Sequence, residues 1–116
     1  ESNIQDNCCL HGDRDSPLTV GNRVVVGHSV TLHGCTVEDG CLIGMGAIIL
    51  SGARIGAGSI IVAAALVTEG ETITPNSVVM GTPGQVKRVT SQEERQRIQQ
   101  NAQSYVDLSR EYLKGS

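Results

Sequence analysis

The residues of this sequence best suited to metal binding or catalysis are three histidines: His11, His28 and His33. His11 and His33 each follow a leucine directly, whereas His28 follows the dipeptide Val26-Gly27. Three neutral imidazoles with an open fourth position form the catalytic zinc arrangement, because the metal lowers the pKa of its bound water to about 7. This chemistry depends on elements that can bring the three side chains to one metal.

Aliphatic residues recur at a fixed spacing through the first two thirds of the chain. The anchors of this pattern are Val20, Val26, Leu32, Val37, Ile43, Ile49, Ile55, Ile61, Val67, Ile73 and Val79, with Ile4 and Leu10 before them. From Val20 onward, every step is six residues except the five from Leu32 to Val37. A helix needs a period near 3.6, so the pattern instead favours short strands with a corner after each hexad. We expect a mainly β protein, a parallel β-helix of hexapeptide repeats over residues 1–89.

The repeat predicts where the histidines lie relative to one another. Three hexads make one triangular coil, so each residue stacks on its counterpart one coil later, about 4.8 Å away. His33 follows His11 by one coil plus four further positions, and a polar loop over residues 12–19 can absorb those four. The two imidazoles should then lie on one face, one coil apart, as two ligands of a tetrahedral ion require. His28 falls on the preceding face near a corner, so we expect it to project toward a neighbouring chain.

The C-terminal part of the sequence has a different period. Ser91-Gln92-Glu93-Glu94 is a capping box, and apolar residues then recur at helical spacing up to Leu113. We therefore expect one amphipathic helix within residues 90–114. Pro83-Gly84 breaks the coils before it, so the helix should fold back along the prism or onto a neighbour. Tyr105 and Tyr112 are expected to be packing residues.

Charge and cysteine usage narrow the possible partners and the compartment. A net charge of −3 and a pI near 5.5 argue against nucleic acid or an anionic membrane as the main partner. The four cysteines form no CxxC pair, which favours a reducing compartment and hence the cytoplasm. Cys8 and Cys41 each precede an anchor by two residues, so both are expected in small inward-facing positions, reduced and buried.

Several motifs resemble those of the γ-class carbonic anhydrases, hexapeptide-repeat proteins with a left-handed β-helix. The matching stretches are Asn3-Ile4-Gln5-Asp6-Asn7, Leu10-His11, Val26-Gly27-His28, Leu32-His33-Gly34-Cys35-Thr36 and Cys41-Leu42-Ile43-Gly44-Met45-Gly46-Ala47. The similarity covers essentially the whole chain, including Gly81-Thr82-Pro83 and the C-terminal helix. It implies a homotrimer with zinc at each subunit interface and reversible hydration of CO2 to bicarbonate by metal-bound hydroxide.

The resemblance also assigns roles to individual residues. It implies that His11 and His33 bind the metal from one chain and that His28 binds it from the neighbour. The counterpart of Gln5 hydrogen-bonds near the metal-bound solvent, and that of Asn3 helps to orient the site, so both are candidate catalytic residues. The counterpart of Asp6 pairs across the interface with an arginine further upstream. Iron or cobalt would also suit a site of three histidines.

The sequence departs from the family pattern at two places. Family members carry further coils upstream, with an arginine and an acidic residue near the site, so we expect this chain to correspond to an N-terminally shortened member. The loop 12–19 is short and lacks the acidic proton-shuttle segment of the fast members. Zinc binding is therefore expected more firmly than turnover.

Two other functions remain open. A hexapeptide acyltransferase shares the coils and the ending Gly81-Thr82-Pro83-Gly84, but it needs one catalytic histidine and a coenzyme A groove. Three histidines at ligand positions favour zinc over this interpretation. A non-catalytic, metal-binding assembly subunit of the same fold is the other alternative.

Overall fold

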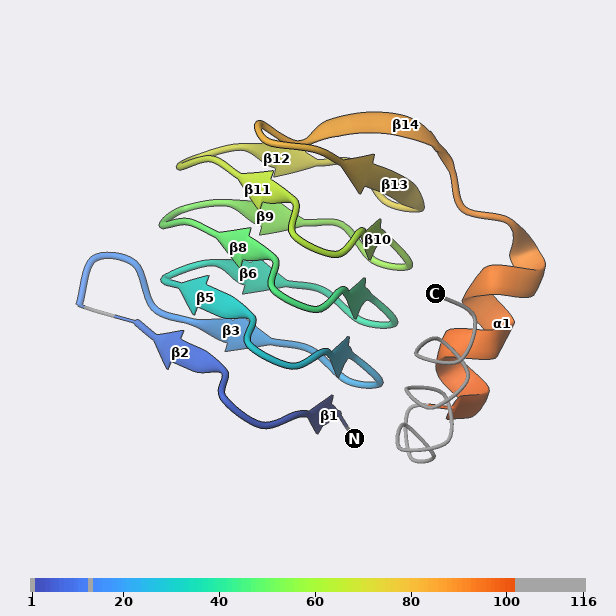
Figure 1. Cartoon of the computed structure of the whole chain (residues 1–116), viewed down its shortest axis with the longest axis horizontal. Helices are drawn as coiled ribbons and strands as arrows, with labels where there is room; N and C mark the ends of the chain where they lie inside the picture. Colours follow the sequence, from blue (N-terminus) through green and yellow to red (C-terminus); the bar gives the residue numbers. More distant parts are fainter. Residues whose placement is uncertain (1, 13, 102–116) are drawn as a thin grey trace.

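The computed structural model describes residues 2–12 and 14–101, which wind into stacked coils with three sheets as the sides of a prism (Figure 1). Sheet A consists, in order, of β1 (Asn3–Ile4), β4 (Val25–Val26), β7 (Leu42–Ile43), β10 (Ile60–Ile61), β13 (Ser77–Met80) and β14 (Gln85–Val89). Sheet B consists of β2 (Cys9–His11), β5 (Thr31–His33), β8 (Ile48–Ile49) and β11 (Leu66–Val67). Sheet C consists of β3 (Thr19–Val20), β6 (Thr36–Val37), β9 (Arg54–Ile55) and β12 (Thr72–Ile73). The mainly β solenoid predicted from the six-residue period is confirmed.

Strand register shows how the coils repeat and where they do not. Leu42 pairs with Ile60, its counterpart after one regular coil of three hexads. Leu10 pairs with Leu32, four positions beyond a regular coil, because the loop after β2 is inserted between them. Val25 pairs with Leu42, one position short of a regular coil, because the step from Leu32 to Val37 is one residue short. Both irregularities lie at the corner between sheets B and C.

The corners depend on backbone conformations that glycine adopts most easily. Gly46 has a φ of +72°, in the left-handed region, three residues after the anchor Ile43. A second kind of glycine follows an anchor directly. A Cβ added to Gly44 would lie 2.5 Å from the backbone nitrogen of Ala63 on the next coil. Glycine at this position therefore lets the coils stack at strand spacing.

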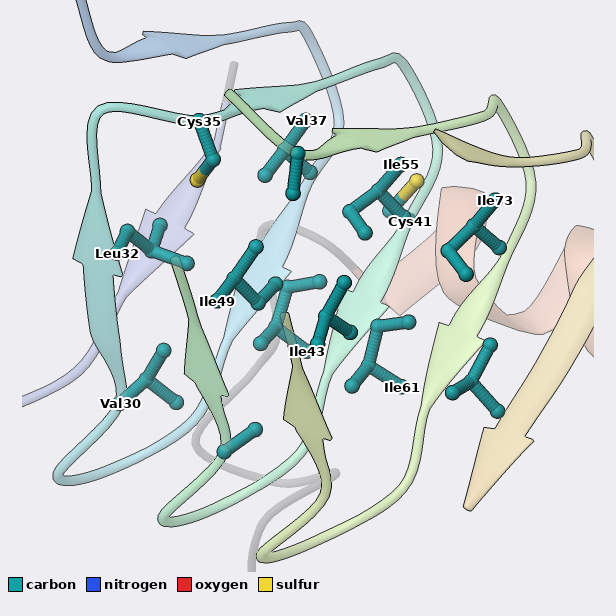
Figure 2. Close-up of a cluster of buried hydrophobic side chains, with 14 of the residues drawn as sticks. Val30, Leu32, Cys35, Val37, Cys41, Ile43, Ile49, Ile55, Ile61 and Ile73 are labelled. Carbon is teal, nitrogen blue, oxygen red and sulfur yellow. The ribbon is translucent and has the colours of Figure 1, made fainter. Parts of the chain in front are cut away.

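The interior of the prism is filled by the anchors and by smaller residues two positions before most of them, such as Cys41, Ala47 and Ala53 (Figure 2). The anchors from Val26 to Val79 are at most 2% exposed. The first coil is different, because Ile4 and Leu10 remain 44% and 39% exposed. The prediction that Cys8 is buried is wrong for the same reason: it belongs to this first coil and is only half-buried.

The last coil leads into an antiparallel strand and a helix. β14 pairs antiparallel with β13 at the end of sheet A. Helix α1 (Gln92–Asn101) begins with the predicted capping box, in which the Glu94 amide donates to Ser91 Oγ at 3.0 Å and the Ser91 amide to Glu94 Oε1 at 2.9 Å. Hydrogen bonds from Arg88 to the Glu94 carboxylate, at 2.7 and 2.9 Å, lower the pKa of Glu94 to about 2.

Helix α1 folds back along the prism beside sheet A (Figure 1). Ile98 is 3% exposed and packs against three outward-facing residues of that sheet: Val25, Leu42 and Ile60. The rest of the expected helix, with Tyr105 and Tyr112, lies outside the described residues. Within residues 2–12 and 14–101, no helix is long and apolar enough to cross a membrane.

The inward register predicts unequal effects of two neighbouring substitutions in β9. Ile55→Ala should lower the free energy of unfolding by about 2–5 kcal/mol, because it leaves a cavity in a fully buried core. Arg54→Ala removes a 2.6 Å ion pair to Glu38, but the Arg54 side chain is 60% exposed, so the loss should stay below about 1 kcal/mol. Denaturant unfolding at one protein concentration measures both. Equal losses would contradict the register.

Burial also predicts the reactivity of two thiols. Cys35 and Cys41 are 1% and 0% exposed, and burial raises the pKa of each thiol to about 11. The thiolate is the reactive form, so neither should react with a thiol reagent in the native protein at neutral pH. A Cys8→Ser/Cys9→Ser variant isolates these two thiols, and both should label after denaturation. Rapid native labelling of this variant would rule out the placement.

Candidate metal centre

His11 and His33 lie side by side at the ends of two stacked strands. They are register partners in β2 and β5, and their ring centroids are 5.0 Å apart, with the planes inclined by 31°. The repeat count predicts this pairing, because the four extra residues of the first coil come after His11. His11 is exposed and His33 is half-buried, so both rings remain accessible from the outside of the prism.

A hydrogen bond that the sequence did not reveal holds one of these rings. Nδ1 of His33 lies 2.6 Å from Oγ of Ser51, which follows β8 on the next coil. An imidazole whose Nδ1 is engaged in this way presents Nε2 to a metal. The available signal was the repeat itself, since Ser51 lies one regular coil after His33 and so occupies the same column.

His28 does not join this pair within the chain. It lies in the turn after β4, where its carbonyl accepts a hydrogen bond from the Gly46 amide at 2.9 Å. His28 lies before β5, whereas His33 is the last residue of that strand, so most of the strand lies between them. Extended chain rises about 3.3 Å per residue. Two nitrogens bound to one zinc ion are at most about 4.2 Å apart. Accordingly, the described residues contain no group of three or more histidine, cysteine or acidic side chains that could hold a metal.

The other predicted site residues lie on the coil below His28. The amides of Asn3 and Gln5 donate to the carbonyls of Val24 and Val26, at 2.9 and 3.0 Å. The Asp6 carbonyl accepts from the amide of Ser29, the residue after His28, at 3.1 Å.

The predicted site residues therefore fall into two groups. We call His11 and His33 the histidine pair; the other four, Asn3, Gln5, Asp6 and His28, form the corner group. Gln5, Asp6 and His28 lie at the corner between sheets A and B, and Asn3 lies just before it in β1 of sheet A. The opposite edge of sheet B carries the histidine pair.

The donor chemistry of the histidine pair fits a borderline metal ion. Imidazole nitrogen is a preferred ligand of zinc and also suits iron and cobalt. The pair offers two facing rings, one with its Nδ1 already hydrogen-bonded, as metal-binding histidines commonly have. One chain thus brings two imidazoles together, whereas a catalytic zinc site commonly has three protein ligands.

Comparison with known proteins gives consistent matches. The family "bacterial transferase hexapeptide (six repeats)" matches residues 34–69. A probable carbonic anhydrase of Methanocaldococcus jannaschii is 52% identical, over 93% of this chain and 68% of its own length. The mitochondrial gamma carbonic anhydrase 2 of Arabidopsis thaliana is 36% identical, over 93% of this chain and 41% of its own. This chain therefore spans about two thirds of the first relative and less than half of the second.

Among solved structures, one similar fold carries a different description. A crystal structure from Bacillus cereus, described as a putative acetyltransferase, superposes with a TM-score of 0.86 at 40% identity. The match covers 99% of this chain and 67% of that one. Hexapeptide-repeat coils of this kind thus occur in proteins with more than one described activity, and the site residues must decide between them.

Proposed function

The chain belongs to the γ-class carbonic anhydrase family, whose hexapeptide repeats form a left-handed β-helix, and on that premise we propose that it binds zinc and hydrates CO2 reversibly to bicarbonate. The observation that carries this proposal is the histidine pair, with ring centroids 5.0 Å apart on the outside of the prism. An acyltransferase needs one catalytic histidine and has no use for two facing rings.

The proposed site is shared between two chains of a homotrimer. His11 and His33 bind the metal from one chain, and His28 of the partner subunit completes the set, because the two groups of site residues occupy opposite edges of sheet B. Exposed apolar side chains support an interface there. Ile48 on the outside of sheet B is 39% exposed, and Met45, beside the turn of His28, is 47% exposed.

His11 and His33, with His28 of the partner subunit, would hold the zinc, which would lower the pKa of a bound water to about 7 and supply a nucleophile at neutral pH. The polar side chains of the corner group would position the reactants. The same partner subunit that contributes His28 also contributes Gln5 and Asn3. The side-chain amides of these two residues would hold solvent and CO2 in position by hydrogen bonding. Asp6 is exposed in the single chain and is proposed to lie at the interface between chains. Iron or cobalt could occupy the same imidazoles.

Metal content and CO2 hydration test the proposed function together. We expect one zinc per chain after dialysis against a weak chelator, and CO2 hydration that a strong chelator abolishes and added zinc restores. His11→Ala is the matched control and should lose both. Zinc without hydration would instead favour the non-catalytic assembly subunit. Transfer of an acetyl group from acetyl coenzyme A, unaffected by the chelator, would favour the acyltransferase.

Mixed trimers test how the site is shared. His28→Ala and His33→Ala should each fail to bind zinc tightly, because two imidazoles hold it far less well than three. When the two variants are denatured and refolded together, each mixed trimer gains one complete interface. The His28→Ala chain supplies His11 and His33 there, and the other chain supplies His28. Random mixing should restore about one quarter of the wild-type zinc content.

A second mixture is the control for this experiment. Refolding His11→Ala with His33→Ala should restore no zinc binding, because each variant chain lacks one of the two histidines that a single chain must contribute to a site. The variants have equal masses, so one variant of each mixture is labelled with 15N, and native mass spectrometry then identifies the hybrid trimers by their intermediate masses. Zinc recovery in the second mixture, or none in a first mixture that contains hybrids, would overturn the shared site.

A further inference from the structure

Ser51 is fixed next to His33 by the backbone of two coils. The amide of Gly52, the next residue, donates to the carbonyl of Gly34, the residue after His33, at 2.9 Å. On its other side, the Ser51 carbonyl accepts from the amide of Gly70 on the following coil, also at 2.9 Å. The position of the Ser51 hydroxyl relative to the His33 ring therefore follows from the stacking of the coils.

Gly34 provides the space for this contact. Its φ is +58°, and a Cβ there would lie 3.3 Å from Oγ of Ser51 and 2.6 Å from the carbonyl oxygen of Ser16. A larger residue would force this corner apart. The short step from Leu32 to Val37 passes through Gly34, so the irregularity of the repeat coincides with the site where the hydroxyl meets the ring.

The direction of the hydrogen bond decides whether His33 can bind a metal. A neutral imidazole has one N–H and one lone pair, on different nitrogens. If Nδ1–H donates to Ser51 Oγ, the lone pair is on Nε2, the nitrogen left for a metal. If the hydroxyl donates to Nδ1, Nε2 carries the proton and cannot bind. The 2.6 Å contact thus connects Ser51, which lies outside the predicted site, to the tautomer of the proposed ligand His33.

We propose that Ser51 is a positioning residue for metal binding: its hydroxyl accepts the Nδ1 proton of His33, orients the ring and leaves Nε2 free to bind. This inference rests on the proposed zinc site and deepens it. In the column formed by His11, His33 and Ser51, the middle ring is held between a hydrogen-bond acceptor and a second imidazole. The tautomer and orientation of the His33 ring are therefore fixed before a metal binds.

The tautomer can be measured without any metal. In the metal-free full chain labelled with 15N-histidine, long-range 1H–15N spectra distinguish the two neutral forms of each ring. We expect the Nδ1–H form for His33 in the wild type and in Ser51→Thr, which keeps the hydroxyl. Ser51→Ala should populate both forms. A wild-type ring mainly in the Nε2–H form, or an unchanged ring in Ser51→Ala, would overturn the inference.

Zinc affinity provides the second readout. Ser51→Ala should bind zinc about 10- to 100-fold more weakly in a chelator competition, as for other residues that orient a metal ligand. Ser51→Thr should stay close to wild type. Glu69→Ala is the matched control, because Glu69 is exposed at the same corner one coil further from His33. Equal affinities for Ser51→Ala and Glu69→Ala would refute the role of Ser51.

The two readouts separate this inference from the proposed function. A wild-type chain that binds no zinc would defeat the proposed function, while the metal-free spectra would still show whether Ser51 sets the His33 tautomer. A wild-type chain that binds zinc normally, with a Ser51→Ala variant of equal affinity, would leave the proposed function intact and remove Ser51 from it. Thermal unfolding of each variant verifies that the coils remain folded.

Discussion

The backbone hydrogen bonds between successive coils are the interaction on which the rest of this structure depends. They run from strand to strand and from corner to corner, as from the Leu42 amide to Ser59 and from the Gly46 amide to His28. Because each coil is tied to the next at every side of the prism, residues one coil apart share one environment. The fold converts spacing along the chain into columns of side chains. The buried column of Ile43, Ile61 and Val79 and the exposed pair of His11 and His33 have the same origin.

The two breaks in this repeat coincide with the candidate metal site. The four-residue insertion follows His11, and the shortened step follows Leu32, so both occur at the corner between sheets B and C. The insertion leaves His11 in register with His33, since it lies in the loop between sheets and not within either strand. The shortened corner passes through Gly34 and admits the hydroxyl of Ser51. An otherwise regular solenoid thus becomes irregular where its histidines could do chemistry.

The proposed division of the metal site between two chains follows from the geometry of the prism. Side chains that follow one another by one hexad fall on different sides, whereas those one whole coil apart fall together. His28 and His33 are near in sequence and separated in space, and His11 and His33 show the reverse. A single chain can therefore bring two of the proposed ligands together, and association around a three-fold axis is the proposed way to add the third. On the proposed function, the chemistry would depend on association of the chains.

The sequence by itself determined the solenoid, its inward register, the capping box of α1 and the pairing of His11 with His33. All four follow from periods and short motifs, which can be read directly from the spacing of residues in the sequence. The tertiary structure decided what no period marks. β14 has no inward anchor, because its five residues are all exposed, and its antiparallel pairing arises only from the reversal after Met80. Cys8 occupies a core position in the repeat, but in this structure the first coil has no coil beneath it to cover that position. The hydrogen bond between His33 and Ser51 and the docking of Ile98 on sheet A depend on distances between side chains, which exist only once the coils have stacked.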